Sequence, residues 1–157
     1  MNTLIVYMTH HGTTRKVVDR LVNGINTGTT HAVDLEKNES PEFSGYDSVI
    51  IGGSIHIGQI QPRIKRFCEQ HKETLLGKKL GLFICFMNQE LAKQEFDNAY
   101  PEELRNHATA KGLFGGELLM EKMNLIEKFM VSKVGKESKS KSQINYEAID
   151  EFIKVMQ

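Results

Sequence analysis

Short runs of apolar residues alternate with amphipathic stretches along most of the chain. Four runs are rich in consecutive apolar residues and glycines, as is typical of strands buried on both faces of a parallel sheet. They cover residues 4–7, 46–54, 80–86 and 112–118. A fifth stretch, residues 31–35, alternates between polar and apolar positions and predicts a half-exposed strand.

Between these expected strands, apolar residues recur three or four positions apart, which predicts helices that bury one face. The first helix follows residue 14 and ends near residues 24–28, where glycines interrupt it. Others begin at Pro62, a favourable first helical position, and at Pro101, which two glutamates follow. Residues 146–156 predict the last helix. Strands that alternate with helices imply a parallel sheet covered on both faces by right-handed crossovers.

The number and order of these elements predict the fold class. Five parallel strands joined by helices fit an α/β, doubly wound sheet with strand order 2-1-3-4-5 and helices on both faces. With 157 residues, of which 39% are hydrophobic and 25% charged, the chain has the size and composition of one globular domain. We therefore expect residues 1–157 to form a single domain.

The first expected strand runs directly into a polar turn at residues 9–14. At such a junction, unpaired backbone N–H groups and the positive end of the helix macrodipole favour a bound phosphate. Gly12 leaves room for one, and the hydroxyls of Thr9, Thr13 and Thr14 add donors. The alternative is an ordinary polar turn that caps the helix.

Two further loops follow buried strands. Open doubly wound sheets bind ligands outside the carboxyl ends of their strands, at the point where the strand order reverses. The loop at residues 54–60 could lay its backbone along a flat heteroaromatic ring, and the loop at residues 86–89 offers a polar amide to the ring's edge. The candidate ring-binding residues are Ser54, Ile55, His56, Ile57, Gly58, Phe86, Met87 and Asn88.

Alternatives remain open at several of these positions. His56 is equally suited as a solvent-facing loop histidine, and Phe86 as the last core residue of its strand. His10 and His11 do not form a convincing metal site, because no further ligand cluster stands at the required spacing. No nucleophile has an obvious partner base, so redox chemistry would have to come from a bound cofactor. His56 is the one side chain that we consider as a proton donor.

The turn after the first strand resembles a known motif. Its pattern T-x-x-G-x-T is similar to the phosphate loop of flavodoxins, usually S/T-x-T-G-x-T, in which a threonine is normal at the position of His11. The resemblance implies a flavodoxin-like fold that binds FMN noncovalently. It also implies that the FMN phosphate is held by Thr9, His10, His11, Gly12, Thr13 and Thr14.

A finer resemblance extends over nearly the whole chain. Residues 3–15, 49–58 and 121–141 are similar to the opening, the second flavin loop and the inserted helix of the menaquinone-dependent protoporphyrinogen IX dehydrogenase family. The resemblance implies a two-electron flavin oxidoreductase that uses a quinone as acceptor. Ile57 stands where that family commonly has an aromatic residue, so ring stacking would fall to His56 or be lost.

Charge narrows the choice of function. Basic and acidic residues both number 20, so the formal net charge is zero. This balance argues against a general nucleic-acid surface. It also counts against a flavodoxin that only carries electrons between redox-protein partners, because such carriers are usually strongly acidic. That carrier remains the alternative function, and a flavin-free interaction domain is a third.

The sequence also bears on location. No apolar run approaches the roughly 18 residues that a membrane-spanning helix needs, and the start lacks the basic region of a signal peptide. We therefore expect a cytoplasmic protein. Cys68 and Cys85 fall in apolar patterns and are expected to be core residues rather than a disulfide or a metal site.

One late stretch, residues 119–134, has an apolar face of its own. Two interpretations stay open: a helix packed on the domain, or a helix whose methionine-rich face meets a membrane surface or a quinone. In the second case the protein would lie at the inner face of the cell membrane. Residues 136–142, rich in lysine and serine, are expected to form a solvated loop. The apolar positions of the helical stretch are Leu119, Met123, Ile126, Met130 and Val134.

Overall fold

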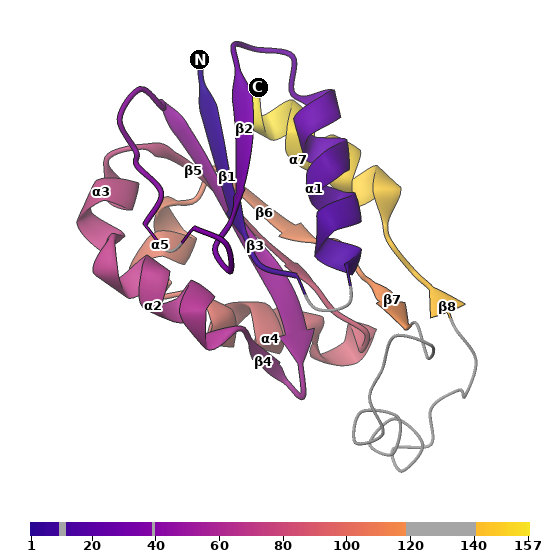
Figure 1. Ribbon diagram of the computed structural model, residues 1–157. Coiled ribbons are helices and arrows are strands. Elements are labelled where there is room, and N and C mark those ends of the chain that lie inside the picture. The colour runs from indigo at the N-terminus through magenta and orange to yellow at the C-terminus, as the bar shows by residue number, and fades with distance from the viewer. Residues whose placement is uncertain (10–11, 39, 119–140) are drawn as a thin grey trace.

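The apolar runs form the centre of a parallel sheet in the computed structural model (Figure 1), which describes residues 1–9, 12–38, 40–118 and 141–157. The order across the sheet is β2-β1-β3-β5-β6, and the short β4 pairs with the end of β3 beside this path. The five long strands therefore confirm the expected α/β doubly wound order. The strands are β1 (Thr3–Tyr7), β2 (Thr30–Asp34), β3 (Ser48–His56), β4 (Gln59–Ile60), β5 (Lys79–Cys85) and β6 (Ala110–Leu113).

The burial of each strand follows from its apolar pattern. All of β1 is buried, as are β3 up to Ser54 and β5 after Lys79. These three strands have neighbours on both sides and helices on both faces, so their buried positions are mostly apolar. The edge strand β2 is half-exposed, as its alternating pattern predicts.

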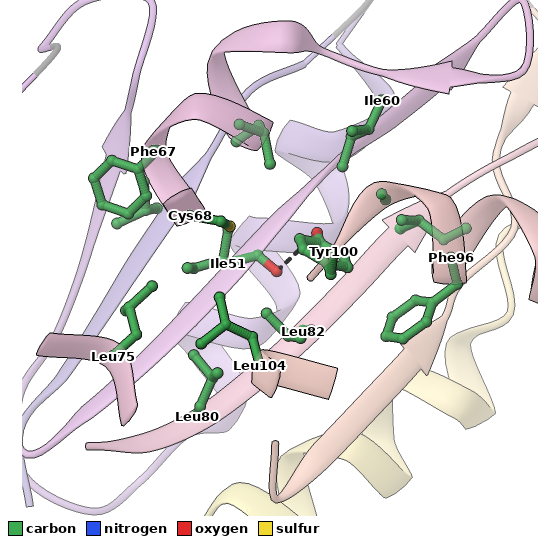
Figure 2. Close-up of a cluster of buried hydrophobic side chains, with 14 of the residues drawn as sticks. Ile51, Ile60, Phe67, Cys68, Leu75, Leu80, Leu82, Phe96, Tyr100 and Leu104 are labelled. Atoms are coloured by element: carbon green, nitrogen blue, oxygen red, sulfur yellow. Dashed lines mark hydrogen bonds between the residues drawn. The ribbon is translucent and has the colours of Figure 1, made fainter. Parts of the chain in front are cut away.

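Helices cover both faces of the sheet (Figure 1). Successive residues of β1 point to opposite faces, so Ile5 packs with one set of helices while Leu4 and Val6 pack with the other. Figure 2 shows part of the second cluster. On the first face lie α1 (Thr13–Gly24) and α7 (Tyr146–Met156). On the second face lie α2 (Pro62–Gln70), α3 (Lys72–Leu76), α4 (Ala92–Ala99) and α5 (Glu102–His107).

Residues 88–110 contain more helix than their irregular pattern predicts. The helix expected at Pro101 is α5, but a 3-10 turn, η1 (Gln89–Leu91), and α4 precede it. The apolar side chains that α4 buries are Ala92, Phe96 and Ala99. Two of the three are alanines, which are weak markers of an apolar face, so the sequence pattern does not indicate this helix.

The expected last strand, residues 112–118, is wrong in its extent. Strand β6 ends at Leu113, and β7 (Glu117–Leu118) forms a separate antiparallel pair with β8 (Lys141–Ser142). Gly115 interrupts the run with a φ of 72°, and a Cβ there would lie 2.1 Å from the carbonyl oxygen of Gln143. The end of the expected solvated loop is therefore a strand, while residues 136–140 lie outside the described residues.

The apolar stretch at residues 119–134 also lies outside the described residues, and both interpretations of it remain predictions. Within the part of the chain that the structure describes, no helix combines the length and apolar character needed to cross a bilayer.

Tyr100, directly after α4, brings a polar group into the apolar core (Figure 2). Its side chain is 2% exposed, and its hydroxyl donates to the carbonyl oxygen of Phe83 at 2.6 Å and lies 3.2 Å from that of Ile51. The two carbonyls belong to neighbouring strands, β5 and β3. Burial raises the pKa of Tyr100 well above its ordinary value, so the hydroxyl keeps its proton. The phenol therefore ties the end of α4 to two central strands.

Replacing Tyr100 with phenylalanine (Tyr100→Phe) removes this hydroxyl and keeps the ring. We expect the free energy of unfolding to fall by about 1–2 kcal/mol, because a buried hydrogen bond is lost. Urea unfolding followed by circular dichroism measures the change. The control Tyr46→Phe removes a hydroxyl that lies 2.8 Å from Nδ1 of exposed His31, and it should be less destabilising. Equal losses in the two variants would contradict the role assigned to Tyr100.

Candidate functional site

The three expected loops leave the sheet at one edge (Figure 1). The parallel register places Tyr7 beside Gly52, so the end of β1 meets the end of β3. The N–H of Met8 continues this pairing by donating to the carbonyl oxygen of Gly52 at 3.3 Å. Ser54 lies opposite Cys85 in the same way, which brings the third loop to the second. The carboxyl edge of the sheet thus collects the loops at residues 9–14, 54–60 and 86–89.

The first loop leads into the N-terminus of α1. Gly12 precedes the helix with a φ of 88°, a left-handed conformation that suits glycine. Among the described residues no side chain caps this helix, and its first turn carries no acidic residue. The positive end of the helix is therefore available to an anion. His10 and His11 lie outside the described residues.

Two threonine hydroxyls beside this helix end are buried without a partner. Thr14 is 0% exposed, and its Oγ1 has no hydrogen-bond partner among the described residues. The Oγ1 of Thr9 is likewise buried and has no hydrogen-bond partner among the described residues. A buried hydroxyl without a partner costs free energy, about 1–3 kcal/mol. Both hydroxyls therefore favour a ligand that supplies hydrogen-bond acceptors at this point.

The second loop is a hairpin, which corrects the sequence expectation that the strand ends at Ser54. Strand β3 continues to His56, which pairs with Gln59 of β4 across a two-residue turn. Both turn residues have positive φ, 50° at Ile57 and 74° at Gly58, as in a type I′ turn. An isoleucine at positive φ is strained, since that position favours asparagine or aspartate.

The strained isoleucine is also exposed. The side chain of Ile57 is 65% exposed at the tip of the hairpin. In the third loop and the turn that follows it, Met87 is 40% and Leu91 44% exposed. Large apolar residues that stay exposed at loops around one edge are suited to cover an apolar ligand.

Ser54, just before the hairpin turn, is held by a residue that sequence reasoning missed. Its N–H donates to Oε1 of Gln61 at 3.0 Å, and Nε2 of Gln61 donates to the Ser54 hydroxyl at 2.8 Å. Gln61 occupies the N-cap position of α2, directly before Pro62. Its place before a proline that begins a helix is the one sequence signal that could have drawn attention to it.

The third loop offers one donor group and uses one side chain for packing. Phe86 is 5% exposed and lies in the core cluster with Phe96. Of the two roles considered for it, its side chain therefore has that of the last core residue of its strand. The Oδ1 of Asn88 accepts from the N–H of Glu90 at 3.0 Å and begins the 3-10 turn. The amide NH2 of Asn88 has no such partner among the described residues and can donate to a ligand.

Both cysteines are buried in this arrangement. Cys68 and Cys85 are free thiols buried in opposite core clusters, as expected from the sequence. Burial raises the pKa of the Cys68 thiol to about 12, so it stays protonated and unreactive.

The strand order and the three loops around its carboxyl edge define a doubly wound protein of the flavodoxin-like class. The chain belongs to the flavodoxin-domain family, whose model matches residues 4–145. Among curated relatives, protoporphyrinogen IX dehydrogenase (quinone) of Escherichia coli K12 is 30% identical over 77 residues. That match covers 48% of this chain and 42% of the relative, which is less than half of the relative's length.

Solved structures show the same fold. The flavodoxin of Streptococcus pneumoniae TIGR4 superposes with a TM-score of 0.58 at 14% identity, covering 99% of this chain and 97% of that chain. Rubredoxin oxygen:oxidoreductase of Desulfovibrio gigas gives a TM-score of 0.63 at 15% identity, covering 99% of this chain and 35% of that chain. At these identities the likeness shows the fold alone.

Glu95 on α4 is a buried carboxyl that the sequence did not single out. It is 8% exposed, and its Oε1 has no hydrogen-bond partner among the described residues. Burial raises the pKa of Glu95 above its ordinary value. The folded protein therefore binds this proton more tightly than the unfolded chain. The stabilisation that this tighter proton binding provides is complete below the ordinary glutamate pKa. It is lost as the pH rises through the raised pKa of Glu95.

Replacing Glu95 with glutamine (Glu95→Gln) should raise the free energy of unfolding at pH 7 and leave it nearly unchanged at low pH, where both side chains are neutral. Urea unfolding across this pH range measures the difference. The control Glu90→Gln neutralises an exposed glutamate on η1 and should change stability little. Parallel pH curves for the wild type and Glu95→Gln would refute the raised pKa.

Proposed function

We propose that the chain binds FMN at the carboxyl edge of its sheet and transfers electrons through it. The observation that carries the proposal is the pair of buried, unpartnered hydroxyls of Thr9 and Thr14 at the uncapped end of α1. A phosphate supplies the acceptors that both hydroxyls lack, and its charge suits the helix end. Membership of the flavodoxin-domain family supports the same cofactor.

The residues around the site fit each part of FMN. Gly12, Thr13 and Thr14 offer a phosphate the backbone and hydroxyl donors of a helix N-terminus. Ile57 and Met87 offer exposed apolar surface to a flat ring, and the NH2 of Asn88 can donate to its polar edge. When bound, FMN supplies the electron-accepting and electron-donating chemistry, and the protein supplies binding, orientation and exclusion of water.

The remaining candidates have narrower roles. Ile55 is partly buried against the core, and with Gly58 it shapes the hairpin that carries Ile57. Phe86 contributes backbone to the third loop while its ring stays in the core. His56, at the end of β3, is the side chain that we propose as a proton donor, because it is the one titratable side chain in the hairpin at residues 54–60.

For the reaction itself, we propose an oxidoreductase of the protoporphyrinogen dehydrogenase type that passes electrons to a quinone. The partial match to the dehydrogenase of Escherichia coli and the zero net charge support it. The second candidate is an electron carrier between proteins, which the flavodoxin fold supports equally. The net charge of zero favours the first, because a carrier relies on charge to find its partner.

The FMN proposal predicts a specific behaviour for Thr14→Val, which replaces the buried hydroxyl with a methyl group of similar size. We expect FMN to bind about tenfold more weakly, because one phosphate donor is lost. The ligand-free variant should be at least as stable as the wild type, since an unpartnered buried hydroxyl is removed. Fluorescence titration with FMN and thermal unfolding measure the two effects.

Two controls belong to this experiment. Riboflavin, which has no phosphate, should bind the wild type and Thr14→Val equally. Thr27→Val changes an exposed threonine outside the site and should leave FMN affinity unchanged. Unchanged FMN affinity in Thr14→Val would contradict the phosphate site, and absence of FMN binding by the wild type would overturn the proposed function.

The rate at which a quinone reoxidises the reduced flavin distinguishes the dehydrogenase from the carrier. We expect the flavin, once bound and reduced without oxygen, to be reoxidised rapidly by a menaquinone analogue. Stopped-flow absorbance follows the return of the oxidised flavin spectrum. Free reduced FMN at the same concentration is the control for reaction in solution. Tight FMN binding with no acceleration by the protein would favour the carrier instead.

A further inference from the structure

Gln61 and Ser54 form a pair whose hydrogen-bond directions follow from chemistry alone. The backbone N–H of Ser54 can only donate, so the Gln61 atom that lies 3.0 Å from it is the amide oxygen. The other end of the amide is then the NH2 group, which can only donate, and it lies 2.8 Å from the Ser54 hydroxyl oxygen. That oxygen accepts from Gln61, so the hydrogen of the Ser54 hydroxyl is left to bond elsewhere.

No second partner takes that hydrogen within the described part of the chain. The amide of Gln61 is the one group there that bonds the Ser54 hydroxyl. Ser54 is 7% exposed and ends the pairing of β3 with β5, next to the strand end from which the phosphate loop leaves. A buried hydroxyl at this place presents a donor of fixed direction to whatever occupies the candidate site.

We propose that Gln61 is a positioning residue that holds the Ser54 hydroxyl as a hydrogen-bond donor to an acceptor atom of the bound flavin. This inference rests on the proposed binding of FMN. The acceptor is an oxygen or nitrogen atom, either on the phosphate or on the polar edge of the ring. Without Gln61, the hydroxyl would rotate freely and its hydrogen could turn back into the protein.

The replacement Gln61→Glu tests this direction with almost no change of shape. One carboxylate oxygen still accepts from the Ser54 N–H, but the other now accepts where the NH2 donated. The Ser54 hydroxyl then turns its hydrogen toward the substituted side chain and away from the ligand. We expect FMN to bind about tenfold more weakly, as in Ser54→Ala, because the same donor is lost in both variants.

A matched control separates this effect from the added charge. Gln59→Glu places the same charge on the same hairpin, where the exposed Gln59 accepts from Lys65 at 3.1 Å, and it should change FMN affinity less than about twofold. Thermal unfolding of the ligand-free variants and the amide proton shift of Ser54 check that the hairpin is intact.

A double variant that combines Gln61→Glu with Ser54→Ala tests whether Gln61 acts through Ser54. If it does, Gln61→Glu causes no further loss of FMN affinity in the Ser54→Ala background. Equal losses in both backgrounds, or no loss in either, would overturn the inference. A loss for FMN but not for riboflavin assigns the phosphate as acceptor, and a loss for both assigns the ring.

The outcomes also distinguish this inference from the proposal on which it rests. If the wild type binds neither flavin, the proposed function fails. If the wild type binds FMN and Gln61→Glu binds it equally well, only the role of Gln61 fails.

Discussion

The shared carboxyl edge of β1, β3 and β5 is the constraint on which the candidate site depends. The three strands are buried on both faces, so a slip of one residue would exchange the side chains of the two core clusters. Their register is therefore strongly specified, and each strand releases its loop at the same place. The loops converge because the hydrophobic core aligns the strands, and side chains of the site need not bring them together.

The sequence was most informative where one strong pattern decided the structure. The buried strands carry long apolar runs, and the turn at Gly12 and Thr14 follows one of them directly, so the fold and the position of this turn before α1 could be predicted. The hairpin at Ile57 could not, because isoleucine is a poor marker of a turn that favours asparagine. The pairing of Gln61 with Ser54 depends on folded geometry, which no local pattern records.

The sequence also predicts secondary structure incorrectly where a local signal is weak or misleading. Gly115 sits within an apolar run, and the left-handed φ of 72° with which it interrupts the strand is not visible in the sequence. Helix α4 buries two alanines and Glu95 beside a single large apolar residue, Phe96, a composition that does not predict an apolar face. Two locally unfavourable features of the described residues, the unpartnered Thr14 hydroxyl and the strained Ile57, lie near the ligand edge, although Thr30 and Ser48 also have unpartnered buried hydroxyls at the opposite edge. Natural proteins accept such departures where a ligand compensates for them.

The antiparallel pair β7 and β8 has a consequence for how this fold varies in length. Leu118 pairs with Lys141, so the chain leaves this small sheet and re-enters it at adjacent positions. A connection between neighbouring antiparallel strands can be as short as a two-residue turn or as long as a whole subdomain, since the entropy of closing it grows only slowly with length. The pair is therefore a natural insertion point, at which related chains can gain or lose sequence while β6 and α7 keep their places on the parallel sheet.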